Sequence, residues 1–254
     1  MNLSKNTICI SILAATIFLF AGCNKIYDYI KHHPGGIEDG CRIKFISNQY
    51  SGTTYTLSFE YNQLGNPVHI KSVPVLEGYP NRRFIYDNKN RLILYNGYYQ
   101  DTTLFEYRIS FYYDKQNRVT HDTGYFIGGY WDGEIYAASK RATRYEYDQY
   151  GRISKTIAQE LLYESQPYTT IYEYDARGNL KYPGDGADYD NQTSLRRTHP
   201  LWMFLDRDYS VNNYFKASAY NKKGLPVRTN LSQIGYNTFL WWPIQNAELT
   251  WECK

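Results

Sequence analysis

The sequence lacks the short motifs that mark the common classes of enzyme. It contains no His-Glu-x-x-His, no Gly-x-Ser-x-Gly and neither of the glycine-rich loops that bind nucleotides. Its five histidines are scattered, and the acidic run Asp185, Asp188 and Asp190 does not follow the ligand order of a calcium loop. A carboxylate pair for glycoside hydrolysis stays open, because the separation of two carboxylates is a three-dimensional quantity. We therefore predict a protein that is not an enzyme and holds no metal or cofactor.

A strong charge of one sign is also lacking. The chain has 28 Lys and Arg against 25 Asp and Glu, for a formal net charge of +3. Proteins that bind nucleic acid rely on many cationic contacts to phosphates, so this balance gives no electrostatic reason to expect such a partner. The adjacent pair His32 and His33 has no second ligand pair at metal-binding spacing, which favours a solvated linker.

The N-terminus carries the one long apolar run, from Ile8 to Phe20, preceded by Lys5. The run is too short for an ordinary membrane-spanning helix and is typical of a secretion signal. The segment Leu19 to Cys23 resembles the bacterial lipobox, with Phe20 where Leu is usual. This resemblance implies cleavage after residue 22, a diacylglyceryl group on Cys23 and attachment to the outer membrane, on either its periplasmic or its outer side. A plain secretory signal or an uncleaved anchor is the alternative.

Cysteine is sparse, with four in the chain. Cys9 lies in the signal and Cys23 is assigned to lipid, which leaves Cys41 and Cys253 near the two ends of the remaining sequence. An envelope compartment permits a disulfide between them, and such a bond requires the first and last strands to be neighbours. Two unpaired thiols at separate sheet edges are the alternative, since pairing does not follow from sequence alone.

The abundant residue is tyrosine, with 29 copies, and it introduces a turn that recurs six times. Each turn follows a Tyr, opens with Asp or Asn and has Gly or Asn three residues later. The six turns are Asn62 to Gly65, Asp87 to Asn90, Asp114 to Asn117, Asp148 to Gly151, Asp175 to Gly178 and Asn221 to Gly224. Asp or Asn favours the first position of a type I turn, and Gly or Asn suits a following left-handed residue. We call these the Tyr-Asp turns and predict a β-hairpin at each.

One register explains all six hairpins. Pairing the opening residue with the residue four later sets Asp87 against Arg91, and likewise Asp114 against Arg118 and Asp148 against Arg152. The preceding tyrosines then face Pro67, Leu92, Val119, Ile153, Leu180 and Pro226. Steps of two backward place Phe59, Phe84, Phe111, Tyr145 and Tyr172 on the same face, while Glu60, Glu146 and Glu173 fall on the other. The alternation predicts an aromatic face that is buried and a polar face that is wet.

The strands predicted from these patterns form an antiparallel up-and-down meander. They are residues 41–48, 53–61, 66–75, 82–87, 91–99, 104–114, 118–127, 141–148, 152–162, 167–174, 179–183, 214–221, 225–234 and 238–252. About fourteen strands in a closed or nearly closed barrel leave a lumen too wide for side chains alone, because about eight strands is the filled size. We expect the apolar segment Pro200 to Leu205 to form a short helix that plugs or caps it. Residues 23–39 are a tether, and residues 40–254 form one all-β domain.

Two of the turns carry a family resemblance. Tyr147 to Ile153 reads Tyr-Asp-x-x-Gly-Arg-Ile and Tyr174 to Leu180 reads Tyr-Asp-x-x-Gly-Asn-Leu, which resemble the YD repeats of RHS and teneurin proteins. Residues 40–254 are similar to uncharacterised Gram-negative lipoproteins with a porin-like fold, including the segment from His199 to Asn213. The resemblance implies the fold and the envelope location but no activity. In large RHS proteins such strands enclose cargo and are linked in some cases to carbohydrate, but this chain has too few repeats for a shell.

Three functions remain open at this point. The first is glycan binding at the loop 128–140, where aromatic rings for stacking lie beside hydrogen-bond acceptors; its residues are Tyr125, Tyr130, Trp131, Asp132 and Glu134. The second is a structural role in an envelope complex, with the loops of one rim meeting a partner protein. The third is a transmembrane pore. The predicted register puts His69, His121, Lys155 and Arg228 on the aromatic face, and cations facing lipid at mid-depth cost about 2–4 kcal/mol each.

Overall fold

The computed structural model describes residues 40–50, 53–75, 79–101, 103–181, 188–229, 236–237, 242–243 and 246–253. The predicted signal 1–22, the lipid site Cys23 and the tether 23–39 lie outside the described residues. Among the helices of the described part, none combines the length and the apolar composition needed to cross a bilayer.

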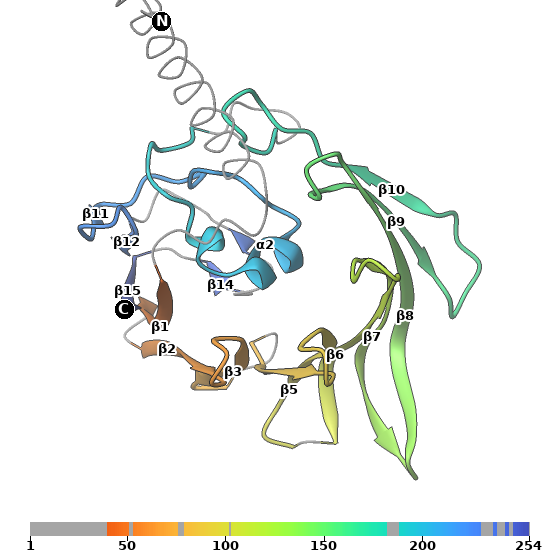
Figure 1. Cartoon of the computed structure of the whole chain (residues 1–254). Coiled ribbons are helices and arrows are strands. Elements are labelled where there is room, and N and C mark those ends of the chain that lie inside the picture. The colour runs from red at the N-terminus through yellow and green to blue at the C-terminus, as the bar shows by residue number, and fades with distance from the viewer. Residues whose placement is uncertain are drawn as a thin grey trace, which may run out of the picture.

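The fold is one antiparallel sheet of thirteen strands, in the order β10-β9-β8-β7-β6-β5-β4-β3-β2-β1-β15-β12-β11. The strands are β1 Cys41–Tyr50, β2 Thr53–Tyr61, β3 Pro67–Val73, β4 Asn81–Tyr86, β5 Leu92–Tyr98, β6 Leu104–Tyr113, β7 Val119–Trp131, β8 Glu134–Tyr147, β9 Ile153–Glu160, β10 Tyr168–Ile171, β11 Ala219–Tyr220, β12 Pro226–Arg228 and β15 Ala247–Cys253. A separate pair is formed by β13 Tyr236–Asn237 and β14 Trp242–Pro243. The sheet curls around a short helix, and no hydrogen bonds join its edges β10 and β11 (Figure 1). The predicted all-β meander is confirmed, as a curled sheet that stays open.

The six Tyr-Asp turns have the predicted geometry. At the second of them, the Asp87 N–H donates to the Arg91 carbonyl at 2.9 Å and the Asn90 N–H donates to the Asp87 carbonyl at 3.0 Å. One Asp87 carboxylate oxygen accepts from the backbone of Lys89 and Arg91, and the other accepts from the Arg91 guanidinium at 2.7 Å. The left-handed position has positive φ in every turn; its residues are Gly65, Asn90, Asn117, Gly151, Gly178 and Gly224. The predicted tyrosine partners and the three Asp–Arg ion pairs are confirmed.

The predicted placement of four cations on the aromatic face was wrong. Immediately beyond each Tyr pair the register shifts by one residue, so that Tyr61 pairs with Pro67 while Glu60 pairs with His69. This β-bulge turns the following residues to the opposite face. His69 accordingly meets Glu60 at 3.1 Å, and Lys155 meets Glu146 at 2.8 Å. His121 and Arg228 move in the same way, since His121 stacks on Tyr112 and Arg228 pairs with Glu248.

The loop predicted at residues 128–140 is also not a loop. Strands β7 and β8 continue through it as a long hairpin that closes at Asp132 and Gly133, with φ values of 51° and 82°. An Asp-Gly pair supplies both positive φ angles that a two-residue hairpin turn requires. Two predicted strands differ from expectation. Of residues 179–183, the described part 179–181 forms a bridge at Leu180 while 182–183 lie outside the described residues, and residues 214–221 reduce to Ala219–Tyr220.

Aromatic side chains tie the first four Tyr-Asp hairpins to one another and carry the same kind of contact to Leu180, Pro226 and Ile43. The donor groups reach backbone carbonyls at 2.6–2.9 Å. The donor and acceptor pairs are Tyr61 with Ile43, Tyr86 with Pro67, Tyr113 with Leu92, Tyr147 with Val119, Tyr189 with Leu180 and Trp251 with Pro226. We call this set the aromatic ladder. Most of its acceptors are residues that face the Tyr of the neighbouring hairpin, so the ladder links hairpin to hairpin along the sheet.

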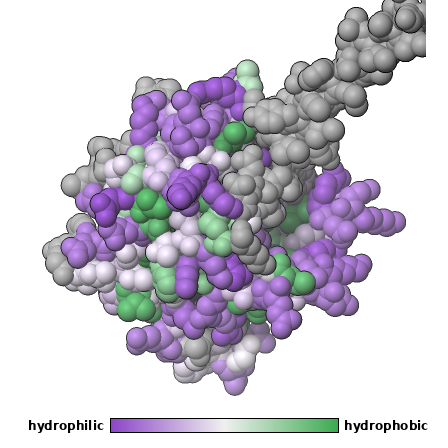
Figure 2. Space-filling view, turned by 60° about the vertical axis from the view of Figure 1, so that its left-hand side comes forward, coloured by the Kyte–Doolittle hydropathy of each residue, from purple (hydrophilic) through white to green (hydrophobic). Residues whose placement is uncertain are grey.

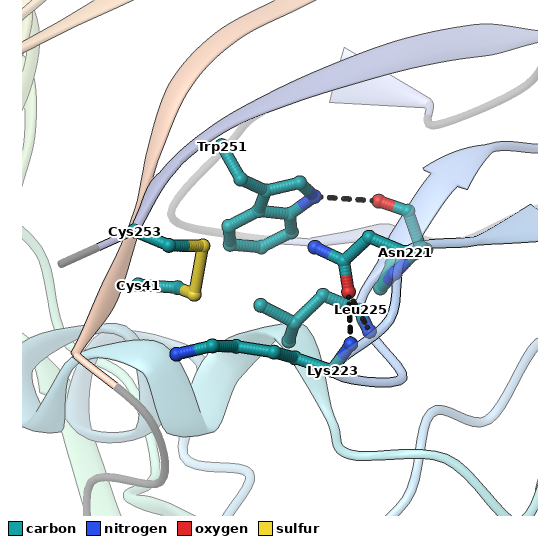
Figure 3. Close-up of a disulfide and its surroundings, with 7 residues drawn as sticks. Cys41, Asn221, Lys223, Leu225, Trp251 and Cys253 are labelled. Atoms are coloured by element: carbon teal, nitrogen blue, oxygen red, sulfur yellow. Dashed lines mark hydrogen bonds between the residues drawn. A yellow bond between two sulfur atoms is a disulfide. The ribbon is translucent and has the colours of Figure 1, made fainter.

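The predicted disulfide joins the first strand to the last. Cys41 pairs with Cys253, and the C-terminus lies beside β1 (Figures 1 and 3). The next residues repeat the pattern of a Tyr-Asp turn, since Arg42 and Glu252 form an ion pair at 2.9 Å and Ile43 faces Trp251. The disulfide therefore stands where a turn would otherwise connect the two strands.

Helix α2, Pro200–Asp206, lies within the curl and follows the 3₁₀ helix η1, Leu195–Thr198. Its Trp202 is fully buried and meets Phe59 and Phe84 edge-on, with ring centroids 6.0 and 5.8 Å apart. This confirms the predicted plug and makes the aromatic side the inner face of the sheet, which is the name used below. The opposite, outer face is polar, and the side of the molecule that carries β1, β12 and β15 is mostly hydrophilic with small separate hydrophobic patches (Figure 2).

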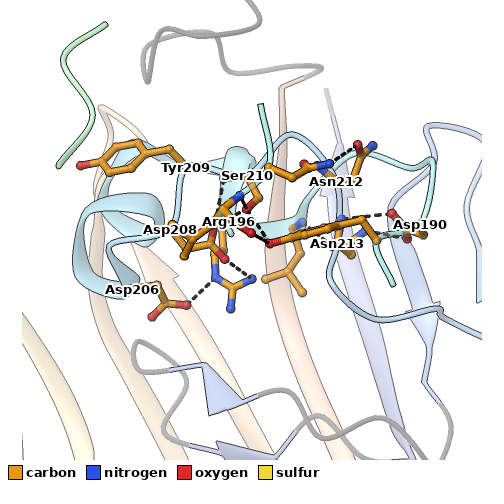
Figure 4. A network of polar contacts seen from close by, with 12 residues as sticks. Asp190, Arg196, Asp206, Asp208, Tyr209, Ser210, Asn212 and Asn213 are labelled. Atoms are coloured by element: carbon orange, nitrogen blue, oxygen red, sulfur yellow. Dashed lines mark hydrogen bonds and ion pairs between the residues drawn. The ribbon is translucent and has the colours of Figure 1, made fainter. Parts of the chain in front are cut away.

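A buried polar network holds the segment around α2 in place (Figure 4). Arg196 forms ion pairs with Asp206 at 2.6 Å and with Asp208 at 3.3 Å, and all three side chains are buried. Asn213 donates to the Asp190 carboxylate at 3.0 Å. Asp190, from the predicted acidic turn, is thus a buried hydrogen-bond partner. Because buried charges are tolerated only when paired, this network fixes where the plug sits.

Replacing both Cys41 and Cys253 by Ala should lower the free energy of unfolding by about 2–5 kcal/mol, because the bond closes a very long loop. Urea unfolding of the full-length protein, with and without reductant, measures this. Arg42→Gln removes the adjacent exposed ion pair and should cost less than about 1 kcal/mol. Equal urea midpoints for the double variant and the oxidised wild type would show that the disulfide does not stabilise the fold.

His199 should make the fold sensitive to acid. Its Nδ1 accepts the Leu201 N–H at the start of α2, and burial lowers the pKa of His199 to about 4. At pH values between about 4 and the ordinary histidine pKa of about 6.5, His199 binds a proton in the unfolded chain but not in the folded protein. Stability should therefore fall as the pH drops through this window, by at most about 3 kcal/mol.

The matched variant is His199→Ser, which keeps an N-cap acceptor and does not titrate in this range. The free energy of unfolding, measured at intervals from pH 7 to pH 4, should decline less steeply in the variant than in the wild type. Parallel curves would assign the acid sensitivity to other groups.

Candidate functional site

A cavity of about 160 Å³ lies between α2 and the inner face of strands β5 to β8. We call it the inner cavity. Its size is below the range of about 300–1,000 Å³ that holds drug-sized ligands, so it suits one small ring or group. The plug fills most of the curl and leaves this space on the side of β6, β7 and β8.

Aromatic rings from both the sheet and the helix form its walls. Phe204 of α2 meets Phe111 and Tyr145 of the sheet, each at a centroid distance of 5.5 Å. Phe126 of β7 and Tyr107 of β6 continue the lining. Because the rings lie at different angles, some present their faces to a ligand and others their edges. Ring faces carry partial negative charge and ring edges partial positive charge, so they favour different ligand groups.

A missing side chain keeps the cavity open. Gly124 lies on β7 between two lining residues, Asp122 and Phe126. A Cβ built at Gly124 would come within 2.8 Å of the Phe126 ring and 3.3 Å of Ile109. Any residue other than glycine would therefore force the ring of Phe126 to move.

The polar groups of the inner cavity centre on Asp122. This buried carboxyl accepts a hydrogen bond from the Tyr145 hydroxyl. Burial raises the pKa of Asp122 above its usual range, while the Tyr145 hydrogen bond and the nearby guanidiniums of Arg207 and Arg141 oppose that rise. Burial likewise raises the pKa of Tyr145, so its hydroxyl keeps its proton.

Two arginines complete the lining. Arg207 ends α2 in a left-handed conformation, with φ of 54°, and its guanidinium lies 5.8 Å from the centre of the Tyr145 ring. Arg141 projects from β8, and its guanidinium lies 4.6 Å from the centre of the Phe126 ring. Within the part of the chain that the structure describes, neither arginine forms an ion pair with a carboxylate.

The five residues predicted to bind a ligand lie outside this cavity. Trp131 is 80% exposed at the end of the β7–β8 hairpin, where Asp132 and Glu134 are also exposed. Tyr130 packs edge-on against Phe105, and Tyr125 lies under the Lys140 ammonium at 5.0 Å. The structure therefore groups three of them at the hairpin end, and it places Tyr125 and Tyr130 in separate contacts along the strand.

The residues of the inner cavity had a weak signal in the sequence. Asp122 is buried on β7, between Val119 and the inward positions Gly124 and Phe126. Arg141 lines the same cavity from β8 but is an exposed residue. A charged residue at a buried strand position, such as Asp122, is a departure from the pattern that indicates a function or a buried pair. The bulges after each turn hid this signal, because they shift the inward positions by one residue.

A wider hollow of about 510 Å³ lies at the rim of the Tyr-Asp turns, beside His199 and Pro200. Its charged lining residues Arg42 and Arg91 are already paired with Glu252 and Asp87. The inner cavity is the stronger candidate because its arginines, Arg141 and Arg207, form no ion pair with a carboxylate among the described residues. Among the described residues, no group of three or more His, Cys, Asp or Glu side chains is placed to hold a metal ion.

Comparisons with known proteins assign no family. No family model matches the chain, and no curated protein matches it. Similar solved structures include TcdB2-TccC3-Cdc42, with a TM-score of 0.30 and 16% identity over 48% of this chain, and TcdB2-TccC3-TEV, with a TM-score of 0.26 and 13% identity over 54%. The matched regions are 7% and 9% of those chains. Likeness at this level carries no argument about function.

Replacing Tyr145 by Phe should destabilise the fold more at neutral than at acid pH. The change leaves the buried Asp122 carboxyl without its hydroxyl partner, which costs about 1–3 kcal/mol. Because the folded pKa of Asp122 is already raised, its neutral form is lost as the pH rises, and the charged form then keeps the Thr143 hydrogen bond but lacks the one from Tyr145. Unfolding at pH 4.5 and pH 7.5 tests this. Adding Asp122→Asn should remove the pH dependence of the loss.

Proposed function

We propose that this protein is a non-catalytic, lipid-anchored envelope protein that holds a carbohydrate in the inner cavity. The observation that carries the proposal is a half-enclosed space with aromatic walls and charged hydrogen-bonding groups. Sugars present apolar ring faces and many hydroxyls. Aromatic rings beside guanidinium and carboxyl groups complement both features.

The lipid anchor follows from the N-terminal sequence. Acylation of Cys23 would attach the chain to a membrane, and the tether 23–39 would separate the sheet from it. Charged side chains on the outer face, such as Lys71, Arg83 and Arg144, favour an anchored domain over strands that face lipid, because each would cost about 2–4 kcal/mol at mid-depth.

A second candidate function is docking of a protein partner. The connection between β9 and β10, together with β10 itself, exposes large apolar side chains at the edge of the sheet; they are Leu161, Leu162 and Tyr163 in the connection and Tyr168 and Ile171 in β10. Strand β10 is also an edge strand, which leaves one side of its backbone available for pairing. These features support the structural alternative without excluding a sugar in the cavity.

Carbohydrate binding is tested on a glycan array with the full-length protein in detergent. The protein should retain a subset of glycans, and Phe126→Ala should weaken binding to them by about tenfold, because an aromatic contact contributes about 0.5–1.5 kcal/mol. Gly124→Ala should have a similar effect by pushing the Phe126 ring into the cavity. Trp131→Ala is the matched control, since Trp131 lies on the exposed hairpin end.

The same comparison separates the two candidate surfaces. Loss of binding in Trp131→Ala but not in Phe126→Ala would move the site to the hairpin, as the sequence first indicated. Absence of binding to every glycan would favour the partner-docking function.

Lipidation depends on one residue. Cells that express the wild-type protein with an alkyne-labelled fatty acid should incorporate the label, and Cys23→Ala should abolish incorporation. Cys9→Ala is the control, because it removes a cysteine from the same N-terminal segment. Label retained in Cys23→Ala would contradict the anchor.

A further inference from the structure

We infer that the carbohydrate held in the inner cavity carries a carboxylate, and that Arg207 and Arg141 bind it. The inference rests on the proposed function and adds the chemical class of the ligand: an acidic sugar, such as a uronic acid, in place of a neutral one.

The first observation is the pairing state of the arginines. Arg196 is buried against Asp206 and Asp208, and the arginines of the Tyr-Asp turns each meet an aspartate, as Arg152 meets Asp148 at 2.7 Å. Arg141 and Arg207 line a cavity and have no such partner among the described residues. Guanidinium groups that face an enclosed space without a carboxylate provide a site for an anion.

The second observation is that both groups are positioned before a ligand arrives. The left-handed backbone at Arg207 directs its side chain back from the end of α2 toward Tyr145 and Tyr172. Arg141 stacks over Phe126. Arg207 is partly buried, so it has less side-chain freedom to lose on binding than the exposed Arg141, which is held by its contact with the ring.

The third observation is the state of the nearest acid. Asp122 lies close to both arginines but directs its carboxyl to Tyr145. Asp122 supplies one carboxyl against two guanidiniums, and burial raises its pKa. The inner cavity therefore keeps a positive character, and a neutral sugar would leave it without a counter-charge.

A carboxylate on a sugar ring matches this arrangement in shape as well as in charge. A guanidinium presents parallel N–H groups that a carboxylate accepts in pairs, which fixes the orientation of the ring. The ring itself can then pack against Phe126 or Phe111, which lie within the same lining. Phosphate and sulfate esters of sugars also bind guanidinium groups, so the experiment must distinguish them.

The test is to titrate the full-length protein in detergent with small-molecule probes and to measure binding by saturation-transfer NMR and calorimetry. The probes are galacturonate and galactose, glucuronate and glucose, with glucose 6-phosphate and acetate as further arms. The sugar acids should bind at least about tenfold more tightly than the matched neutral sugars and than acetate. Arg207→Gln and Arg141→Gln should each reduce this preference to less than threefold, because each variant loses more affinity for the sugar acid than for the matched neutral sugar.

Two further variants sharpen the result. Arg207→Lys keeps the charge but loses the paired N–H groups, so it should recover only part of the preference. Arg144→Gln removes a positive charge from the outer face of β8, the strand that carries Arg141, and should leave the preference for sugar acids intact.

The outcomes separate this inference from the proposed function. Equal binding of acidic and neutral sugars in the cavity overturns the inference and leaves carbohydrate binding standing. Tighter binding of glucose 6-phosphate than of either sugar acid overturns the carboxylate. Acetate binding as tightly as the sugar acids overturns the role of the sugar ring, and no binding of any sugar overturns both proposals.

Discussion

The aromatic ladder is the contact on which the architecture depends. At each hairpin a buried hydroxyl or indole N–H crosses to a backbone carbonyl of the neighbouring unit, as Tyr86 does to Pro67 and Tyr113 does to Leu92. An unpaired polar group at these sites would carry the full cost of desolvation, so each tyrosine fixes the distance between adjacent hairpins. Because the donors that belong to strands lie on the inner face, the same contact also favours that side of the sheet as the concave one. Burial raises the pKa of these tyrosines, and they therefore remain protonated donors over the physiological range.

The ladder also continues across the junction between strands β15 and β1. Trp251 takes the place of a tyrosine and donates to Pro226, while Tyr61 donates to Ile43 on the first strand. No turn connects β15 to β1. The disulfide and the Arg42–Glu252 ion pair instead hold these two strands in register, as a Tyr-Asp turn does elsewhere. The strands from the two ends of the sequence are thereby joined more firmly than β10 and β11, between which the sheet stays open. Between β10 and β11 the chain leaves the meander to build the plug. Tyr189, in the segment that leads to the plug, donates to the Leu180 carbonyl. Tyr209, which follows α2, makes the corresponding contact with the backbone of Ile153.

The sequence was sufficient to predict the repeated part of the fold, because each Tyr-Asp turn encodes its own geometry locally. The register at Tyr147 and Ile153, the ion pair of Asp148 with Arg152 and the helix at Pro200 all follow from short-range chemistry. The bulge beyond each turn does not, since it depends on the twist of the neighbouring strands, and it reversed the expected faces of His69 and Lys155. The extended β7–β8 hairpin was not predicted for a different reason. Asp132–Gly133 is a local signal for a two-residue turn, but it lies within residues 128–140, which were expected to form a loop.

The inner cavity results from a mismatch between the sheet and the plug that fills it. A sheet of this width encloses more space than its own side chains occupy, and α2 is only seven residues long. Trp202 fills the side toward β2 and β4, where Phe59 and Phe84 receive it. On the opposite side Phe204 reaches Phe111 and Tyr145, and the absence of a side chain at Gly124 leaves the remaining space unfilled. Retaining the buried Asp122 and the partly buried Arg207 there works against stability, because apolar side chains of similar volume would pack the gap without desolvating a charge. Charged groups kept where stability favours apolar ones are the physical reason that we propose a ligand inside the curl.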